Sequence, residues 1–61
     1  MAEPTARQIE CLEAYITHGT VKAAADSMGV AEYTLRNTLH LMRERMEMTT
    51  QQLIVWWARR P

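Results

Sequence analysis

Apolar residues recur every three or four positions along this chain, which is the spacing of amphipathic helices. The first such segment predicts a helix over residues 5–18. Its apolar face comprises Ile9, Leu12 and Ile16, flanked by Cys11 and Tyr15. Thr5-Ala6-Arg7-Gln8 has the form of a capping box, in which the threonine hydroxyl and the glutamine side chain satisfy backbone amides at a helix start. Gly19 stands where a left-handed glycine commonly ends a helix.

Two further helices are predicted on either side of a short glycine turn. The second covers residues 20–28 and begins at the capping residue Thr20. Its inner face comprises Val21, Ala24, Ala25 and Met28. The third covers residues 32–46, and its apolar stripe comprises Leu35, Leu39, Met42 and Met46. Gly29-Val30-Ala31 joins them, and a short turn containing glycine between two helices is typical of a helix-turn-helix, although other helix pairs share it. We expect Val30 to pack between the two helices.

The last predicted helix, over residues 49–60, carries five consecutive apolar residues beginning at Leu53. A second capping box, Thr49-Thr50-Gln51-Gln52, marks its start. Two cations that suit the helix dipole lie at its end, Arg59 and Arg60. Steps of about 100° spread the apolar run over about 400°, so one buried face cannot take all five residues. We expect Leu53 and one tryptophan to complete the core, and the other tryptophan to face outward.

An outward-facing tryptophan on this helix has two interpretations. It marks an interface, since tryptophan is enriched at binding hot spots, or it lies flat over the domain's own surface. The interface interpretation predicts a weak homodimer through the last helix. Its candidate residues are Ile54, Val55, Trp56 and Trp57.

Length and composition predict a single all-α domain over residues 1–61. Good helix formers dominate the composition, and no turn dipeptide separates two alternating runs of the kind that form strand pairs. The single cysteine, Cys11, excludes an internal disulfide. We expect it to be a buried small residue in a reducing, cytoplasmic setting. No stretch approaches the roughly 20 apolar residues of a membrane span, so we expect no membrane partner.

The residue pattern also argues against catalysis. The sequence lacks a nucleophile paired with a general base, a glycine-rich phosphate loop and a His/Cys cluster at zinc spacing. A domain this small has little room for an enclosed substrate pocket. We therefore expect no enzymatic activity, no cofactor and no metal ion.

The polar face of the third predicted helix carries side chains suited to DNA. These residues are Tyr33, Arg36, Asn37, His40 and Arg43. Arginine binds guanine and asparagine binds adenine through paired hydrogen bonds, so Arg36 and Asn37 are candidate base contacts, with His40 beside them. Tyr33 and Arg43 are candidate phosphate contacts, which position a helix without reading sequence. The net charge of zero makes an ordinary solvated face the alternative interpretation.

Four segments match the motifs of one known family. Residues 4–12 are similar to its opening Leu-Thr-x-Arg-Glu-x-Glu-Val-Leu, and Gly19 is similar to the glycine before its second helix. Residues 24–28 resemble its Ile-Ala-x-x-Leu segment, and residues 31–38 resemble its Ser-x-x-Thr-Val-Lys-x-His turn and recognition helix. On these segments the chain resembles the DNA-binding domain of the LuxR/GerE/FixJ family of bacterial regulators.

The resemblance implies a four-helix domain with a central helix-turn-helix that binds double-stranded DNA and regulates transcription. By position it implies base contacts from Arg36, Asn37 and His40. It also implies phosphate contacts from Thr20, Lys22 and Thr34. The last helix would form the dimer contact, and RNA polymerase is a further candidate partner.

Three positions depart from the family pattern. Ala31 replaces the capping serine of the recognition helix, which predicts a loss of about 1 kcal/mol of cap stabilisation. Thr38 occupies the position of the family's histidine. Glu47 occupies the position of the glycine after that helix, so we expect the helix to end without its usual terminator.

Two alternative functions fit the same sequence. The first is a small phage or bacterial protein-interaction module that acts on a regulator or on RNA polymerase through the last helix, which zero net charge and two tryptophans would suit. The second is a sigma-factor domain of the region-4 type, which shares the helix-turn-helix. The separately capped last helix after Thr49 favours the LuxR-type domain over the sigma domain.

Overall fold

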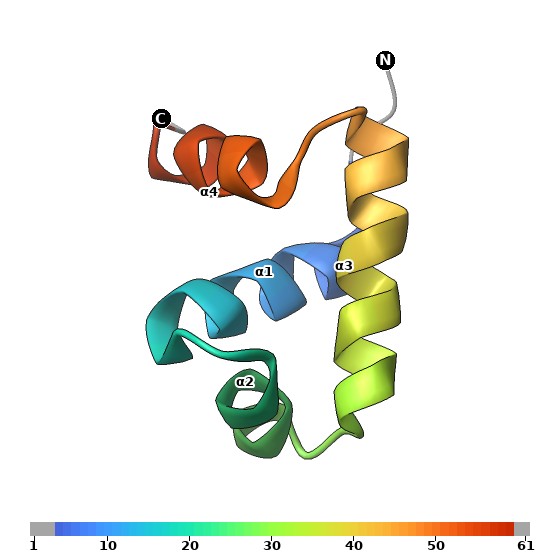
Figure 1. Ribbon diagram of the computed structural model, residues 1–61, viewed down its shortest axis with the longest axis vertical. Helices are drawn as coiled ribbons and strands as arrows, with labels where there is room; N and C mark the ends of the chain where they lie inside the picture. Colours follow the sequence, from blue (N-terminus) through green and yellow to red (C-terminus); the bar gives the residue numbers. More distant parts are fainter. Residues whose placement is uncertain (1–3, 60–61) are drawn as a thin grey trace.

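The computed structural model describes residues 4–59, which form four helices and no strand (Figure 1). The helices are α1 (Ala6–His18), α2 (Val21–Met28), α3 (Glu32–Met46) and α4 (Thr50–Ala58). The predicted all-α, four-helix class is confirmed. In Figure 1, α2, α1 and α4 lie along one side of α3, with α4 beside its C-terminal end. The last helix was expected to reach residue 60, and Arg60 lies outside the described residues.

Threonine caps start three of the four helices, as the sequence predicts. The hydroxyl groups of Thr5, Thr20 and Thr49 each accept a hydrogen bond of 3.1 Å from the third amide of their helix. Both capping boxes are complete, because the Gln8 and Gln52 side chains accept from the amides of the cap residues. These reciprocal bonds fix where α1 and α4 begin.

The start of α3 has the backbone geometry of a helix cap but no side chain that accepts a hydrogen bond there. Ala31 has φ −72° and ψ 150°, in the extended region that the three threonine caps also occupy. No side chain at this position accepts from the first turn. The first turn of α3 therefore lacks the side-chain cap that the other three helices have.

The end of α3 corrects the expectation drawn from Glu47. This residue adopts the left-handed conformation, with φ 56° and ψ 43°. The Met48 amide donates to the Arg43 carbonyl at 3.0 Å, and the Glu47 amide donates to the Glu44 carbonyl at 3.3 Å. This is the bonding pattern of a Schellman motif. Glu47 thus supplies the terminator that glycine normally provides, and it is the one non-glycine residue with positive φ between residues 4 and 59.

The core gathers one face from each helix. Its buried apolar residues are Cys11, Leu12, Ala24, Ala25, Leu35, Leu39, Met42 and Leu53. The predicted stripe of α3 is confirmed, with Met46 half-buried at its end. The inner face of α2 and the packing of Val30 against the core are confirmed as well.

The buried face of α1 is rotated from the predicted one. Ile16 was expected on the inner face, but it is 38% exposed. The helix instead buries Gln8, Cys11 and Leu12, with Tyr15 half-buried. These four residues lie at i, i+3, i+4 and i+7 and so share a face. Gln8 is buried there because its side chain completes the cap, and Ile16 lies at the edge of that face.

The packing of α4 corrects the expectation of an outward tryptophan. Leu53 is buried, and both Trp56 and Trp57 are half-buried against the core, with ring centroids 6.1 Å apart. Leu53 and the two tryptophans lie at i, i+3 and i+4, so a single helix face holds all three. The large apolar residue that α4 exposes is Val55, at 49%. Ile54 is half-buried.

Cys11 is a free, buried cysteine, as expected. Burial in the apolar core raises the pKa of its thiol above the ordinary value. A neutral thiol packed in the core acts as a small apolar residue. Within residues 4–59, no helix is both long and apolar enough to cross a bilayer.

Candidate nucleic-acid interface

The turn after α2 presents α3 as an exposed helix with one buried stripe. Gly29 adopts φ 70°, and the Val30 amide donates to the Ala25 carbonyl at 3.0 Å, which closes α2 with the same bond that closes α3. α2 and α3 then pack against each other and against α1. The outer side of α3 is free of the other described helices (Figure 1). α2, the three-residue turn and α3 thus form a packed helix pair whose second helix is accessible on its outer side.

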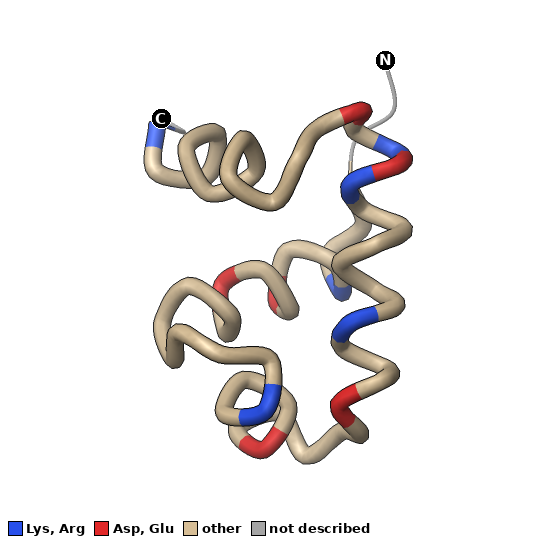
Figure 2. The backbone as a smooth tube through the Cα atoms, in the orientation of Figure 1, with Lys and Arg blue, Asp and Glu red and all other residues tan. Residues whose placement is uncertain are grey.

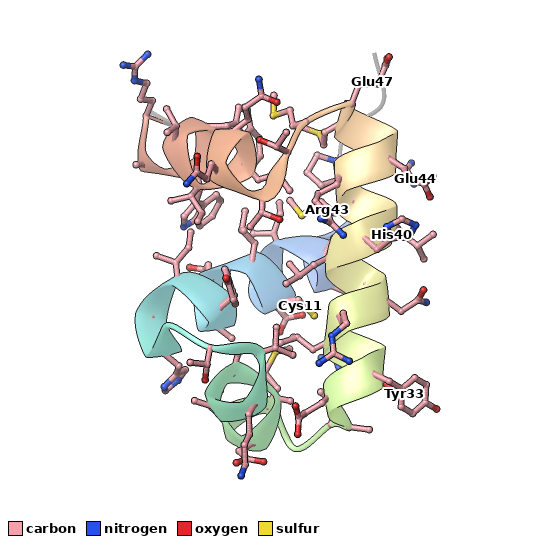
Figure 3. All side chains as sticks on the ribbon, viewed as in Figure 1. Cys11, Tyr33, His40, Arg43, Glu44 and Glu47 are labelled. Carbon is pink, nitrogen blue, oxygen red and sulfur yellow. The ribbon has the colours of Figure 1, made fainter. Side chains whose placement is uncertain are left out.

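The predicted DNA-facing residues of α3 lie together on that exposed side. A shallow, open surface groove is lined by Tyr33, Arg36, Asn37, His40 and Arg43. Four of these five side chains are exposed, and Tyr33 reaches 73%. Figure 3 shows Tyr33 and His40 projecting outward from the helix. The structure therefore brings all five predicted residues onto one surface, with a hydroxyl, two guanidinium groups, an amide and an imidazole available for hydrogen bonds.

Arg36 has only a loose partner on its own helix. Its Nη2 lies 3.9 Å from the Glu32 Oε1, and both side chains are at least half exposed. An exposed ion pair of this length contributes at most about 1 kcal/mol. The Arg36 guanidinium can therefore exchange Glu32 for another acceptor at little cost.

His40 is held between two residues of α3. Its Nε2 lies 3.2 Å from Glu44 Oε1, and its Nδ1 lies 3.4 Å from Arg43 Nη2. Arg43 donates to Nδ1 only when that nitrogen carries no proton. In the tautomer that leaves Nδ1 without a proton, Nε2 carries the hydrogen that Glu44 accepts. Glu44 was not among the predicted site residues, although its i+4 spacing from His40 is the available signal.

Arg43 lies at the edge of the outer face rather than in its centre. Its side chain is half-buried, and its Nη1 donates to the hydroxyl of Thr50 at the start of α4 at 3.3 Å. Figure 3 shows Arg43 directed toward the side of α3 where α4 lies, whereas His40 and Glu44 point away. The prediction that Arg43 lies opposite the apolar stripe is thus corrected, because Arg43 follows Leu39 of that stripe by four residues and so lies only about 40° from it around the helix.

The other predicted phosphate contacts differ in how accessible they are. Lys22 and Thr20 are exposed at the start of α2, although the Thr20 hydroxyl already caps that helix. Thr34 is half-buried, and its carbonyl accepts from the Thr38 hydroxyl at 2.8 Å. The start of α2 adjoins the flank of α3, because Val21 lines the same cleft as Arg36 and Arg43.

Charged residues of both signs alternate along the backbone instead of gathering on one side (Figure 2). α3 itself carries Glu32 in its first turn and Glu44 between Arg43 and Arg45 near its end. The structure thus provides no broad basic surface within residues 4–59, and any anion must be met by a few individual cations.

Comparisons with protein families, with curated proteins and with solved structures give no match to this chain.

Proposed function

We propose that this protein is a sequence-specific, double-stranded DNA-binding regulator of transcription that inserts α3 into the major groove. The observation that carries the proposal is the exposed groove on α3, formed by five polar side chains of the types that contact DNA, on a helix that follows a glycine turn. The major groove, about 12 Å wide, admits one α-helix.

Each residue of the groove has a proposed role. Arg36 releases Glu32 and makes a bidentate contact to guanine, and Asn37 makes one to adenine. His40 offers its Nε2–H to an acceptor on a base edge in place of Glu44. Tyr33 and Arg43 contact phosphates, as do Lys22 and Thr20 from the start of α2. Because the exposed cations are few, we expect a salt dependence equivalent to about 3–5 phosphates per protomer.

A single α3 makes a small interface, so the proposal includes a weak homodimer through α4. One DNA-binding module buries roughly 600–1,000 Å². Two protomers on half-sites one helical turn apart would combine their affinities. Val55 is the exposed centre of the proposed contact, with Ile54 and the accessible edges of Trp56 and Trp57 beside it.

The test begins with selection of a preferred duplex from a randomised pool, followed by fluorescence anisotropy with that duplex. We expect Arg36→Ala to weaken binding by about 1–3 kcal/mol and to relax preference at one base pair, and Asn37→Ala to do so at another. Arg45→Ala is the matched control, because Arg45 is an exposed arginine of the same helix outside the groove.

Two results would overturn the proposal. One is selection of no duplex at low salt, which would favour a protein-interaction module. The other is an Arg36→Ala variant that binds the selected duplex as tightly as the parent and with the same base preference.

A further inference from the structure

A second depression lies on the flank of α3, where all four helices meet. We call it the flank cleft, and its volume is about 280 Å³. Its lining residues are Tyr15 of α1, Val21 of α2, Arg36, Leu39 and Arg43 of α3, and Thr50 of α4. None of these described lining residues is acidic. The polar part of the lining therefore consists of two guanidinium groups and two hydroxyls.

Arg43 has spare hydrogen-bonding capacity in this cleft. A guanidinium has five N–H donors, and the two contacts described above, to Thr50 and His40, use two of them. Its Nε is buried and has no hydrogen-bond partner among the described residues. Buried donors without a partner are rare in native proteins. The side chain therefore lies beside the cleft with part of its donor capacity unused.

The second arginine of the cleft, two turns earlier on α3, is exposed and only loosely paired. Arg36 lines the same cleft, and its long, exposed contact to Glu32 competes weakly for the guanidinium. Two cations that share a cleft repel each other unless an anion lies between them. Their common position thus favours a negatively charged occupant.

Two helix starts add to this electrostatic preference. Val21 and Thr50 are the first residues of α2 and α4. The threonine caps satisfy only the third amide of each helix, at Ala23 and Gln52, so the two amides before each of these remain without a partner within the helix. The positive ends of both helix dipoles therefore adjoin a cleft that already holds two arginines.

We infer that the flank cleft binds a phosphate group, held by Arg43 and the Thr50 hydroxyl and attracted by the nearby positive charge of Arg36, whose guanidinium stays available for a base edge. A phosphate has oxygens directed to several sides, which suits donors that come from more than one helix. The source of the phosphate rests on the proposed function, under which it is a phosphodiester of the DNA strand beside α3. The start of α4 then contacts DNA, and Arg43 is one wall of a phosphate site that α4 completes.

The experiment titrates the full chain with inorganic phosphate at constant ionic strength and follows amide and arginine Nε–H signals by NMR. We expect shifts at Thr50, Gln51 and the Arg43 side chain. Arg43→Gln should weaken phosphate binding about tenfold, the factor expected for one charge-assisted hydrogen bond. Arg36→Gln should weaken it by less than that, because it removes a nearby charge and no hydrogen bond. Arg45→Gln is the matched control and should change it less than twofold, because it removes the same charge from α3 outside the cleft. Circular dichroism checks that each variant retains its helices.

A second arm uses the selected duplex and distinguishes the source of the phosphate. Competition between phosphate and duplex, with both weakened by Arg43→Gln, supports the site and assigns it to the DNA backbone. A second possible result is that the chain binds no duplex but still binds phosphate in a way that depends on Arg43. This result supports the site for a free phosphate and overturns only the proposed function. Absence of shifts at Thr50 and Gln51, or equal effects of Arg43→Gln and Arg45→Gln, overturns the phosphate site even where duplex binding persists.

Discussion

Glu47 holds the left-handed position at the end of α3, and we predict that Glu47→Gly stabilises the fold. The conformation at φ 56° costs a residue with a side chain roughly 1–2 kcal/mol, which glycine does not incur. Glycine loses about 0.5–1 kcal/mol more backbone entropy on folding. The conformational part of the change should therefore raise the free energy of unfolding by about 0–1.5 kcal/mol.

A second contribution comes from the charge of Glu47. A carboxylate beside the negative end of a helix dipole is unfavourable by about 0.3–1 kcal/mol at low ionic strength. The side chain is exposed and makes no hydrogen bond or ion pair among the described residues, so its removal breaks no contact. Glu47→Gln separates the two contributions, because it removes the charge and keeps the Cβ atom.

Thermal and urea unfolding followed by circular dichroism would measure the effect. For a domain of this size, about 1 kcal/mol corresponds to roughly 4–8 °C in Tm. We expect the order of stability to be Glu47→Gly above Glu47→Gln above the parent, with the first difference unaffected by salt. A glycine variant no more stable than the glutamine variant would refute the assignment of backbone strain to this position.

Three further predictions test other parts of the fold. Ala31→Ser should raise the free energy of unfolding by about 1 kcal/mol in urea unfolding, because the backbone already has cap geometry and lacks only the hydroxyl; an unchanged value would contradict it. Burial raises the pKa of the Cys11 thiol, so the native thiol keeps its proton at pH values above about 8.5, where the unfolded thiol ionises. The free energy of unfolding should therefore fall as pH rises through that range. Urea unfolding of Cys11→Ser should lack the part of this fall that comes from the thiol. Val55→Glu should leave binding to one half-site intact and abolish cooperative binding to two half-sites in gel-shift titrations, and unchanged cooperativity would remove the α4 dimer.

Local features of the fold were predictable because contiguous residues determine them. A threonine cap with glutamine three residues later, or a glycine after an apolar stripe, has the same local geometry in any tertiary setting. Thr5, Thr49 and Gly29 show this agreement. Glu47 is the exception, since its type disfavours the conformation that the chain adopts there.

Features that depend on docking were not predictable in the same way. The exposed edge position of Ile16 and the burial of both tryptophans follow from the angle at which α1 and α4 meet the core, which periodicity does not specify. The members of the α3 groove were predictable, because they share one face of a single helix. The contact of Arg43 with Thr50 was not, since it requires the path of the chain between two helices.

The uneven packing of the four helices has a consequence for local stability. α1, α2 and α3 contact one another extensively, whereas α4 adjoins mainly the C-terminal part of α3. Such an element opens before the rest of a domain unfolds, so amide protons of α4 should exchange with solvent at a lower opening free energy than those of α3. A ligand that bridges Arg43 and Thr50 would bind only the closed form and slow that exchange. Slower amide exchange in α4 would then indicate that a ligand occupies the flank cleft.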